Sequence, residues 1–380
     1  MNRNTTPRLV RGCFLAVALL CLTQQAGAAP YRPTDDALVL ERVAGRPPAV
    51  MPGKLEVDVA TRLARIHIER SRQAGDPREL GYAQGLLQPW WNSTQAPAPI
   101  LLLRATLKQA RHDFPGALSD LDQLLKARPD DAQAWLTRAT VLRVQGHYPE
   151  ALAACTPLQS LVDRFIATLC EQSIRGLNGG LDAASQALES LFPALSQQSP
   201  GVAAWYLSER ADMAVRAGKP ELALTLYQQA RIAFPADLDL IAAHADVLLD
   251  QGKPAVALEQ IPSDTAVDAL LLRRALALHA LSDSDLPALD ARLREGFAAA
   301  HRRGEALHLR EETRYRLAMG DDPRMVVELA QRNWQVQHEP WDARLLLAAA
   351  KAAASPSAAE EVQQWLRASR LQDARLKDLR

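Results

Sequence analysis

The chain has 380 residues, of which 48% are hydrophobic and 23% are charged, as is usual for a folded globular protein. Its 44 lysine and arginine residues balance its 44 aspartate and glutamate residues, so the formal net charge at pH 7 is +0. This balance excludes a strongly basic protein and gives no reason to expect nucleic acid or an acidic surface as the partner.

The N-terminus has the pattern of a signal peptide that directs export. Arginines precede an uninterrupted apolar run over residues 13–22, and small residues at 26–28 provide a cleavage site. The run is too short for a membrane-spanning helix, which needs about 20 apolar residues. We therefore predict that residues 1–28 are removed, that the mature protein begins at Ala29 or Pro30, and that it has no stable membrane span. The predicted location is the bacterial periplasm, with secretion as the alternative. The alternatives for the apolar run itself are an uncleaved anchor or a buried helix.

The next segment, residues 29–57, carries five prolines. Proline lacks the backbone N–H that a helix interior needs, so this segment cannot be helical throughout. We expect an extended arm, which is either a loose leader or a strap across the first folded units. From residue 58 onward, helical patterns dominate, and β-branched runs with a period of two are nearly absent.

Two parts of the helical region repeat themselves at a spacing of 34 residues. The segment 218–224 recurs as 252–258, with Gly-Lys-Pro and Ala-Leu at matching places. A second set of matches pairs Leu101, Arg104, Ala105, Phe114, Ala117 and Leu118 with Trp135, Arg138, Ala139, Tyr148, Ala151 and Leu152. Because two independent sets share one period, we predict repeated helix pairs. Small alanines would let paired helices approach, and Gly146, Gly218 and Gly252 would form the turns between them.

This repeat resembles the tetratricopeptide repeat family, whose units have 34 residues and a Trp/Gly/Tyr/Ala/Phe/Pro pattern. The unit at 132–165 matches that pattern closely through Trp135, Ala139, Gly146, Tyr148 and Ala151. The other matching units are 98–131, 204–237 and 238–271. The resemblance implies an all-α fold, an α-solenoid in which antiparallel helix pairs stack into a right-handed superhelix.

Outside these units the pattern is weaker but still helical. Residues 58–91 and 165–200 each fit one further helix pair. Later in the chain, helical runs alternate with breaks at 283–285, 320–323 and 355–357. We therefore divide the mature chain into N-terminal repeats over 58–200 and C-terminal repeats over 201–380, which are degenerate after about residue 268.

The sequence contains no motif of a known catalytic or phosphate-binding site. Its Gly-Lys pairs lack the surroundings of a phosphate loop, and His-Glu-x-x-His, Cys-x-x-Cys and Gly-x-Ser-x-Gly are missing. His301, Glu305 and His308 stand at helical spacing and could hold a metal ion. Gly304 interrupts their shared face and two adjacent arginines would repel a cation, so surface residues without a ligand are the favoured interpretation. We predict no enzyme activity, no metal and no cofactor.

In tetratricopeptide proteins the first helices of successive units line a concave groove, and the resemblance locates the positions of this chain that we expect to be exposed in that groove. The predicted protein-binding residues are Gln133, Thr140, Arg143, Ser208, Asp212, Arg216, Asp239, Asp246 and Asp250. Some family members clamp a peptide carboxylate with Lys and Asn, but the corresponding positions here hold Leu136, Thr140, Ser208, Asp212, Ala242 and Asp246. We therefore predict a groove that selects its partner by shape and a few charges of both signs. A groove of ordinary solvated residues with no dedicated ligand is the alternative.

Two cysteines, Cys155 and Cys170, remain once the signal peptide is removed. They flank a predicted turn between two helices, and antiparallel packing would bring them level. A disulfide between them requires Cα atoms within about 7 Å, and two buried free thiols are the alternative.

The favoured function is a non-catalytic scaffold or adaptor in the periplasm that binds a protein or peptide partner in the concave groove. Nucleic acid is not an expected partner, because the chain has no basic excess. Two alternatives come from other classes of protein. One is an accessory protein for solute or metal trafficking across the envelope, and the other is an enzyme of unrecognised type with its site after residue 268.

Overall fold

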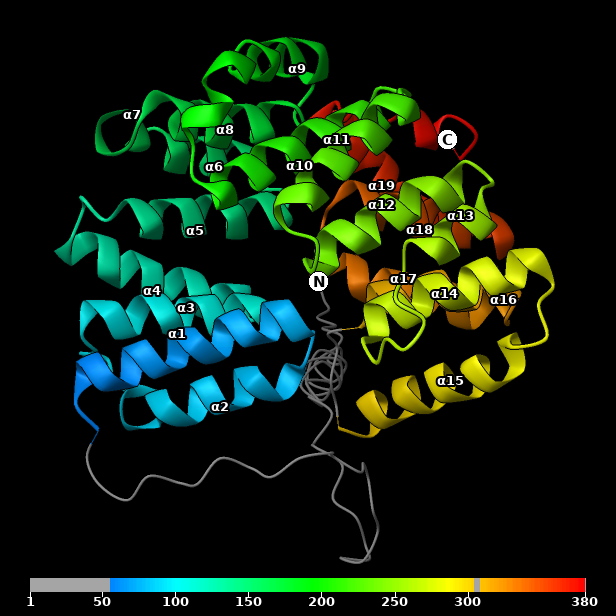
Figure 1. The fold of residues 1–380 in the computed structure, drawn as a ribbon, viewed down its shortest axis with the longest axis horizontal. Helices are drawn as coiled ribbons and strands as arrows, with labels where there is room; N and C mark the ends of the chain where they lie inside the picture. Colours follow the sequence, from blue (N-terminus) through cyan, green and yellow to red (C-terminus); the bar gives the residue numbers. More distant parts are fainter. Residues whose placement is uncertain (1–54, 304–307, 380) are drawn as a thin grey trace, which may run out of the picture.

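The computed structural model describes residues 55–303 and 308–379 and shows an all-α chain (Figure 1). Within these residues there are 19 α-helices and three short 3₁₀ helices, and no β-strand. Neighbouring helices pack in pairs that stack along the chain, so the expected all-α solenoid is confirmed. The predicted signal peptide, residues 1–28, and the part of the predicted arm at 29–54 lie outside the described residues.

The helices follow one another with short connections. The first group comprises α1 (Val57–Ala74), α2 (Pro77–Leu87), η1 (Gln88–Trp90), α3 (Ala98–Ala110), α4 (Phe114–Ala127), α5 (Ala132–Val144), α6 (Tyr148–Cys155), α7 (Leu158–Leu161), α8 (Arg164–Arg175), α9 (Leu181–Glu189) and η2 (Phe192–Gln197). The second group comprises α10 (Pro200–Arg216), α11 (Pro220–Ala233), α12 (Leu238–Asp250), α13 (Pro254–Glu259), α14 (Asp268–Leu281), α15 (Leu286–Arg302), α16 (Leu309–Met319), α17 (Pro323–Trp334), α18 (Pro340–Ala352), α19 (Pro356–Ser369) and η3 (Ala374–Leu376). The breaks expected after residue 268 coincide with the connections between α14 and α15, α16 and α17, and α18 and α19.

The four 34-residue units correspond to the pairs α3–α4, α5–α6, α10–α11 and α12–α13. A side chain no larger than a methyl group lets two helix backbones approach, and a larger one at the same place would overpack the contact. The alanines that the repeat places at these contacts are all buried: Ala105, Ala117, Ala139, Ala151, Ala211, Ala223, Ala245 and Ala257. The repeat pattern therefore records the packing of each helix on its neighbours.

The turn inside each of these units needs a left-handed backbone. Gly146, Gly218 and Gly252 have φ values of +73°, +72° and +66°, which glycine adopts without a steric penalty. In the first unit the equivalent position holds His112, with φ +59°. Its ring stacks on Phe114 with centroids 5.5 Å apart, and this contact helps to hold the strained turn.

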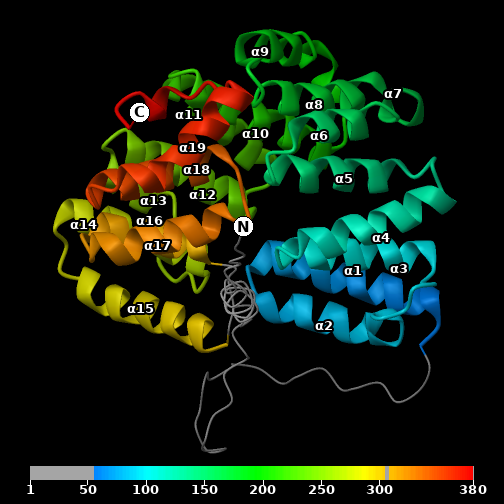
Figure 2. The ribbon, with the colours of Figure 1, turned by 180° about the vertical axis from the view of Figure 1, so that it is seen from behind.

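The C-terminal helices fold back onto the N-terminal half of the solenoid. One buried cluster joins residues of α5, α6 and α8 to residues of α17, α18 and α19, so the core crosses the division proposed at residue 200. The His338 amide donates a hydrogen bond to the Val144 carbonyl over 2.8 Å, and Trp365 packs over Gly146 at the turn of the second unit. Figure 2 shows α18 and α19 next to helices of the N-terminal half.

The first helix of the solenoid also reaches the start of α12. Gly75, which ends α1, lies against Val267 and Leu238. The solenoid therefore curls until its first helix contacts its middle, instead of remaining an open superhelix (Figure 1).

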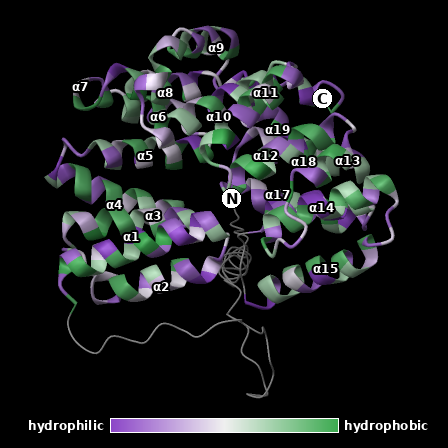
Figure 3. Ribbon diagram, viewed as in Figure 1, coloured by the Kyte–Doolittle hydropathy of each residue, from purple (hydrophilic) through white to green (hydrophobic). Residues whose placement is uncertain are grey.

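Each helix carries both apolar and polar residues, as expected for helices that bury one face (Figure 3). Among the described residues, no helix combines the length and hydrophobicity needed to cross a membrane.

Candidate functional site

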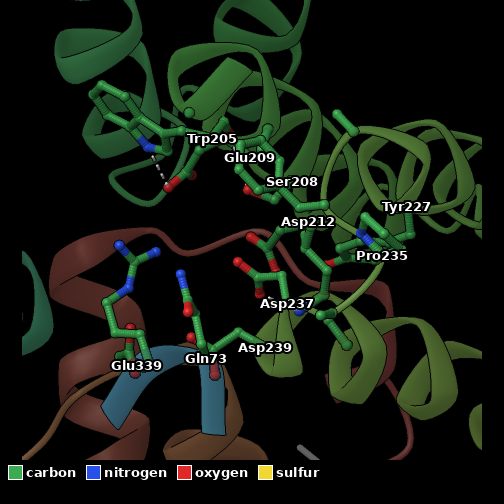
Figure 4. A pocket seen from close by; sticks show the side chains of 18 of the residues that line it. Gln73, Trp205, Ser208, Glu209, Asp212, Tyr227, Pro235, Asp237, Asp239 and Glu339 are labelled. Carbon is green, nitrogen blue, oxygen red and sulfur yellow. Dashed lines mark hydrogen bonds between the residues drawn. The ribbon is translucent and has the colours of Figure 1, made fainter. Parts of the chain in front are cut away.

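A cavity of about 760 Å³ lies on the concave side, where the end of α1 faces α10, the start of α12 and the start of α18. Figure 4 shows Trp205, Ser208 and Glu209 of α10 on one side, and Asp237, Asp239 and the α1 residue Gln73 on the other. Its walls combine charged with aromatic side chains. The aromatic residues are Trp205, Tyr227, Phe234 and Trp341, the acidic residues are Glu69, Glu209, Asp212, Asp237, Asp239 and Glu339, and the basic residues are Arg72 and Arg143.

Local sequence fixes the wall formed by the α11–α12 connection. Helix α11 ends at Ala233, just before Pro235, which has no backbone N–H to continue it. Asp237 then caps α12 by accepting a hydrogen bond from the Leu240 amide over 3.0 Å. This cap places Asp239 in the first turn of α12, at the cavity.

Arg143 forms the opposite wall together with Glu209. Its Nη1 donates to Glu209 Oε1 over 2.6 Å. The Trp205 indole N–H donates to the same oxygen over 3.3 Å, as Figure 4 shows. The attraction of Glu209 raises the pKa of Arg143 and outweighs the effect of burial. Arg143 is therefore held in an ion pair at the cavity wall.

Most acidic side chains of the cavity already have a partner. Four of them form ion pairs: Glu69 with Arg72, Glu209 with Arg143, Asp212 with Arg216, and Glu339 with Arg310. A fifth, Asp237, is occupied as the cap of α12. Asp239 has no hydrogen bond or ion pair among the described residues. Although its carboxylate is open to the cavity, desolvation by the surrounding walls raises its pKa, and the nearby charge of Asp237 adds to this effect.

Four of the nine predicted groove residues line the cavity, namely Arg143, Ser208, Asp212 and Asp239. Gln133 is exposed at the start of α5, outside the lining. The Thr140 hydroxyl is turned back on its own helix and donates to the Leu136 carbonyl over 3.0 Å.

The prediction that Arg216 is an exposed groove residue is wrong. Its side chain is buried, and Nη1 donates to the Gly176 carbonyl over 2.6 Å while Nε donates to Asp212 over 2.9 Å. Burial alone would raise the pKa of Asp212, but the Arg216 charge holds it below its usual value. Arg216 therefore orients the Asp212 carboxylate from behind the cavity wall.

Asp246 is likewise buried, which contradicts its predicted exposure, and Asp250 already has a partner. Asp246 is 6% exposed and accepts hydrogen bonds from both Arg273 and Arg314. Asp250 forms an ion pair with Arg344 of α18 over 2.6 Å. The C-terminal helices thus occupy the part of the groove that these two carboxylates were expected to line.

An arginine cluster surrounds Trp341, at the boundary between the cavity and the filled part of the groove. The guanidinium carbons of Arg314, Arg344 and Arg375 lie 4.5, 4.7 and 5.2 Å from the centroid of a Trp341 ring. These contacts have the geometry of cation–π interactions. The repeat pattern gave no sign of this cluster, because its members come from α16, α18 and η3, outside the four matching units.

The candidate metal residues do not converge. His301 Nε2 lies 2.6 Å from Glu312 Oε2 of the next helix, and Glu305 lies outside the described residues. In the part of the chain that the structure describes, no group of three or more His, Cys, Asp or Glu side chains is arranged to hold a metal ion.

Cys155 and Cys170 are joined by a disulfide, with their Cα atoms 5.9 Å apart. Cys155 ends α6 and Cys170 lies within α8, so the bond ties one repeat to the next. Both residues belong to the cluster that packs against α17–α19.

The sequence model of the tetratricopeptide repeat matches residues 102–156 and 208–261. These two regions of the chain are similar to tetratricopeptide repeats. A chain of the APC/C hetero-tetramer Cut9-Hcn1 has a similar fold, with 14% identity, a TM-score of 0.51, and coverage of 85% of this chain and 62% of that chain. A tetratricopeptide repeat protein from Parabacteroides merdae is 13% identical over 76% of this chain and 99% of its own, with a TM-score of 0.37. No curated protein matches the chain.

Proposed function

We propose that this tetratricopeptide repeat protein is a non-catalytic scaffold, exported to the periplasm, that binds a segment of a partner protein in the concave cavity. The repeats and the fold support a scaffold for protein–protein interaction. The cavity supports the place of binding, because it is concave, partly aromatic and has polar groups that converge on it.

The observation that supports the proposal is that the cavity stays open while helices from the C-terminal half occupy the part of the groove near Asp246 and Asp250. Helix α18 is held against α5 and α12 by the His338–Val144 hydrogen bond and the Arg344–Asp250 ion pair. A partner segment that followed the whole groove would have to displace these contacts. A segment that enters only the cavity contacts residues that already line an open space, and displaces neither contact.

Site-specific photo-crosslinking in the producing cells tests the proposed place of binding. A photoreactive amino acid at Ser208 or at Ala243, which both line the cavity, should capture the same protein. The matched control places it at Thr225, which is exposed on α11 and outside the lining. Capture of that protein equally well from Thr225 would show that the cavity is not where the partner binds.

Export is tested separately from binding. Material recovered from the periplasm should begin at Ala29 or Pro30, because the small residues at 26–28 form the expected cleavage site. N-terminal sequencing that reads an intact Met1 would contradict the proposed processing.

A further inference from the structure

We propose that the cavity recognises a basic side chain of the partner, a lysine or an arginine, and places its cation at Asp239. The inference rests on the proposed function and adds the chemistry that selects the partner segment. Acidic residues outnumber basic ones in the cavity lining, and both lining arginines already face a carboxylate. The cavity is therefore complementary to positive charge.

Asp239 is the acid of the lining to which a ligand can bind without breaking an existing contact. Each of the other five acids has an ion pair or a capping hydrogen bond within the described residues. The Asp239 carboxylate is desolvated by the walls and lies near Asp237, and both effects raise its pKa. A partner cation would relieve both penalties, because it pairs with the Asp239 carboxylate and offsets its repulsion by Asp237.

A second observation is a polar group of the same cavity that no described residue engages. Tyr227 is 6% exposed and lines the cavity, and no hydrogen bond joins its hydroxyl to another described residue. The hydroxyl oxygen itself is not fully buried, so a group that enters the cavity can reach it. Burial raises the pKa of Tyr227, and the largest charge effect on its hydroxyl comes from Asp212. The hydroxyl therefore stays protonated and can accept a hydrogen bond from an ammonium or guanidinium group near the acidic side of the cavity.

The aromatic walls fit the hydrocarbon stem of such a side chain. Trp205 and Phe234 are half-buried and line the cavity. The Trp341 ring is already surrounded by three arginines, whereas no described guanidinium lies over the Trp205 ring. Lysine and arginine have apolar stems that pack on such surfaces while the charged end reaches a carboxylate. An acidic side chain would instead meet an excess of carboxylates.

The test uses three peptides that differ only in their central side chain. The probes are acetyl-Leu-Lys-Leu-amide, its norleucine analogue, which keeps the stem but lacks the charge, and its glutamate analogue. Binding to the full chain is measured by saturation-transfer NMR at low salt. We expect the lysine peptide to bind about fivefold more tightly than the norleucine peptide, which is the upper range for a solvent-accessible ion pair. The glutamate peptide should bind most weakly.

The variant Asp239→Asn removes the charge with almost no change in shape, and should reduce the preference for lysine over norleucine to about twofold or less. The matched control is Asp182→Asn, because Asp182 is also exposed and also occupies the second position of its helix, α9. The control should keep the full preference. Circular dichroism of both variants verifies that helicity is unchanged.

Three results would overturn the inference. The first is equal binding of the lysine and norleucine peptides. The second is a preference for lysine over norleucine that is unchanged in Asp239→Asn. Both results would leave the proposed function intact, with the cavity as a protein-binding site. Failure of all three peptides to bind would also overturn it. The proposed function is then decided by the crosslinking experiment, whose readout does not depend on charge.

Discussion

Replacing Asp246 by alanine should destabilise the fold strongly, although this residue occupies a groove position in the repeat. Its Oδ1 accepts hydrogen bonds from Arg273 Nε over 2.9 Å and from Arg314 Nη1 over 2.6 Å, and its Oδ2 accepts from Arg273 Nη2 over 2.8 Å. The carboxylate is thus the shared partner of two arginines that are themselves largely buried.

Removing one member of a buried ionic group costs about 3–5 kcal/mol, since the remaining charge stays buried without compensation. Two contacts would survive in Asp246→Ala. Arg273 still donates to the Ala269 carbonyl, and Arg314 still lies over Trp341. We therefore expect a loss of about 3 kcal/mol in the free energy of unfolding, at the lower end of that range. Charge reversal to lysine would place a third cation beside the two arginines and cost more.

Asp250→Ala is the matched control, because it removes the same kind of side chain from the same helix. Its ion pair with Arg344 is accessible to solvent, so the expected loss is about 0–1 kcal/mol. Urea unfolding followed by circular dichroism gives the comparison. Repeat proteins need not unfold in two states, so the midpoints of the two variants are compared directly. Equal midpoints would refute the reasoning that burial separates these two carboxylates.

Three further predictions concern acid, the second turn and the disulfide. Burial alone would raise the pKa of Asp246, but its two arginines hold that pKa below the unfolded value of about 3.9. The ionised carboxylate therefore contributes fully to stability above about pH 4, and this contribution is lost as the pH falls further. The urea midpoint of the wild type should accordingly fall more steeply below that pH than the midpoint of Asp246→Asn. Gly146→Ala should lower the free energy of unfolding by about 2–4 kcal/mol, because φ is +73° and the new Cβ would lie 2.8 Å from the indole nitrogen of Trp365. Gly252→Ala, where φ is +66° but the space is open, should lower it by about 1–2 kcal/mol in the same unfolding assay. Mass spectrometry of a non-reduced digest should find Cys155 and Cys170 in linked peptides, and two free cysteine peptides in fresh material would contradict the bond. Reduction of the bond should lower the free energy of unfolding by about 3 kcal/mol.

The helix pairs were predictable because local residues determine where each helix begins and ends. Prolines stand in the first turn of many helices, and glycines with a positive φ end the first helix of three units. His112 shows where such local rules stop. It occupies the glycine position of its unit in a strained conformation, which is supported by Phe114 and by Gln337 of the distant α17–α18 connection. A sequence pattern with a short range contains no information about a neighbour 225 residues away.

The candidate site was predictable in part for the same reason. The repeat places Arg143, Ser208, Asp212 and Asp239 on the concave face, and the walls formed by α5, α10 and α12 follow from that register. Glu69 and Trp341 come from helices outside the matching units and reach the cavity because the solenoid closes on itself. The closure depends on the curvature of all the repeats together, which no single motif specifies.

Closure changes what this solenoid can do. In an open array each repeat contacts only its neighbours, so units can unfold and bend separately. Here the cluster shared by α5, α6, α8 and α17–α19, together with the Arg344–Asp250 pair, links units far apart in the chain. The cavity walls come from α1, α5, α10, α12 and α18, and therefore exist together only when α1 and α18 are both in place. A ligand of the cavity must consequently stabilise the closed form, because its free energy of binding is available to no other arrangement.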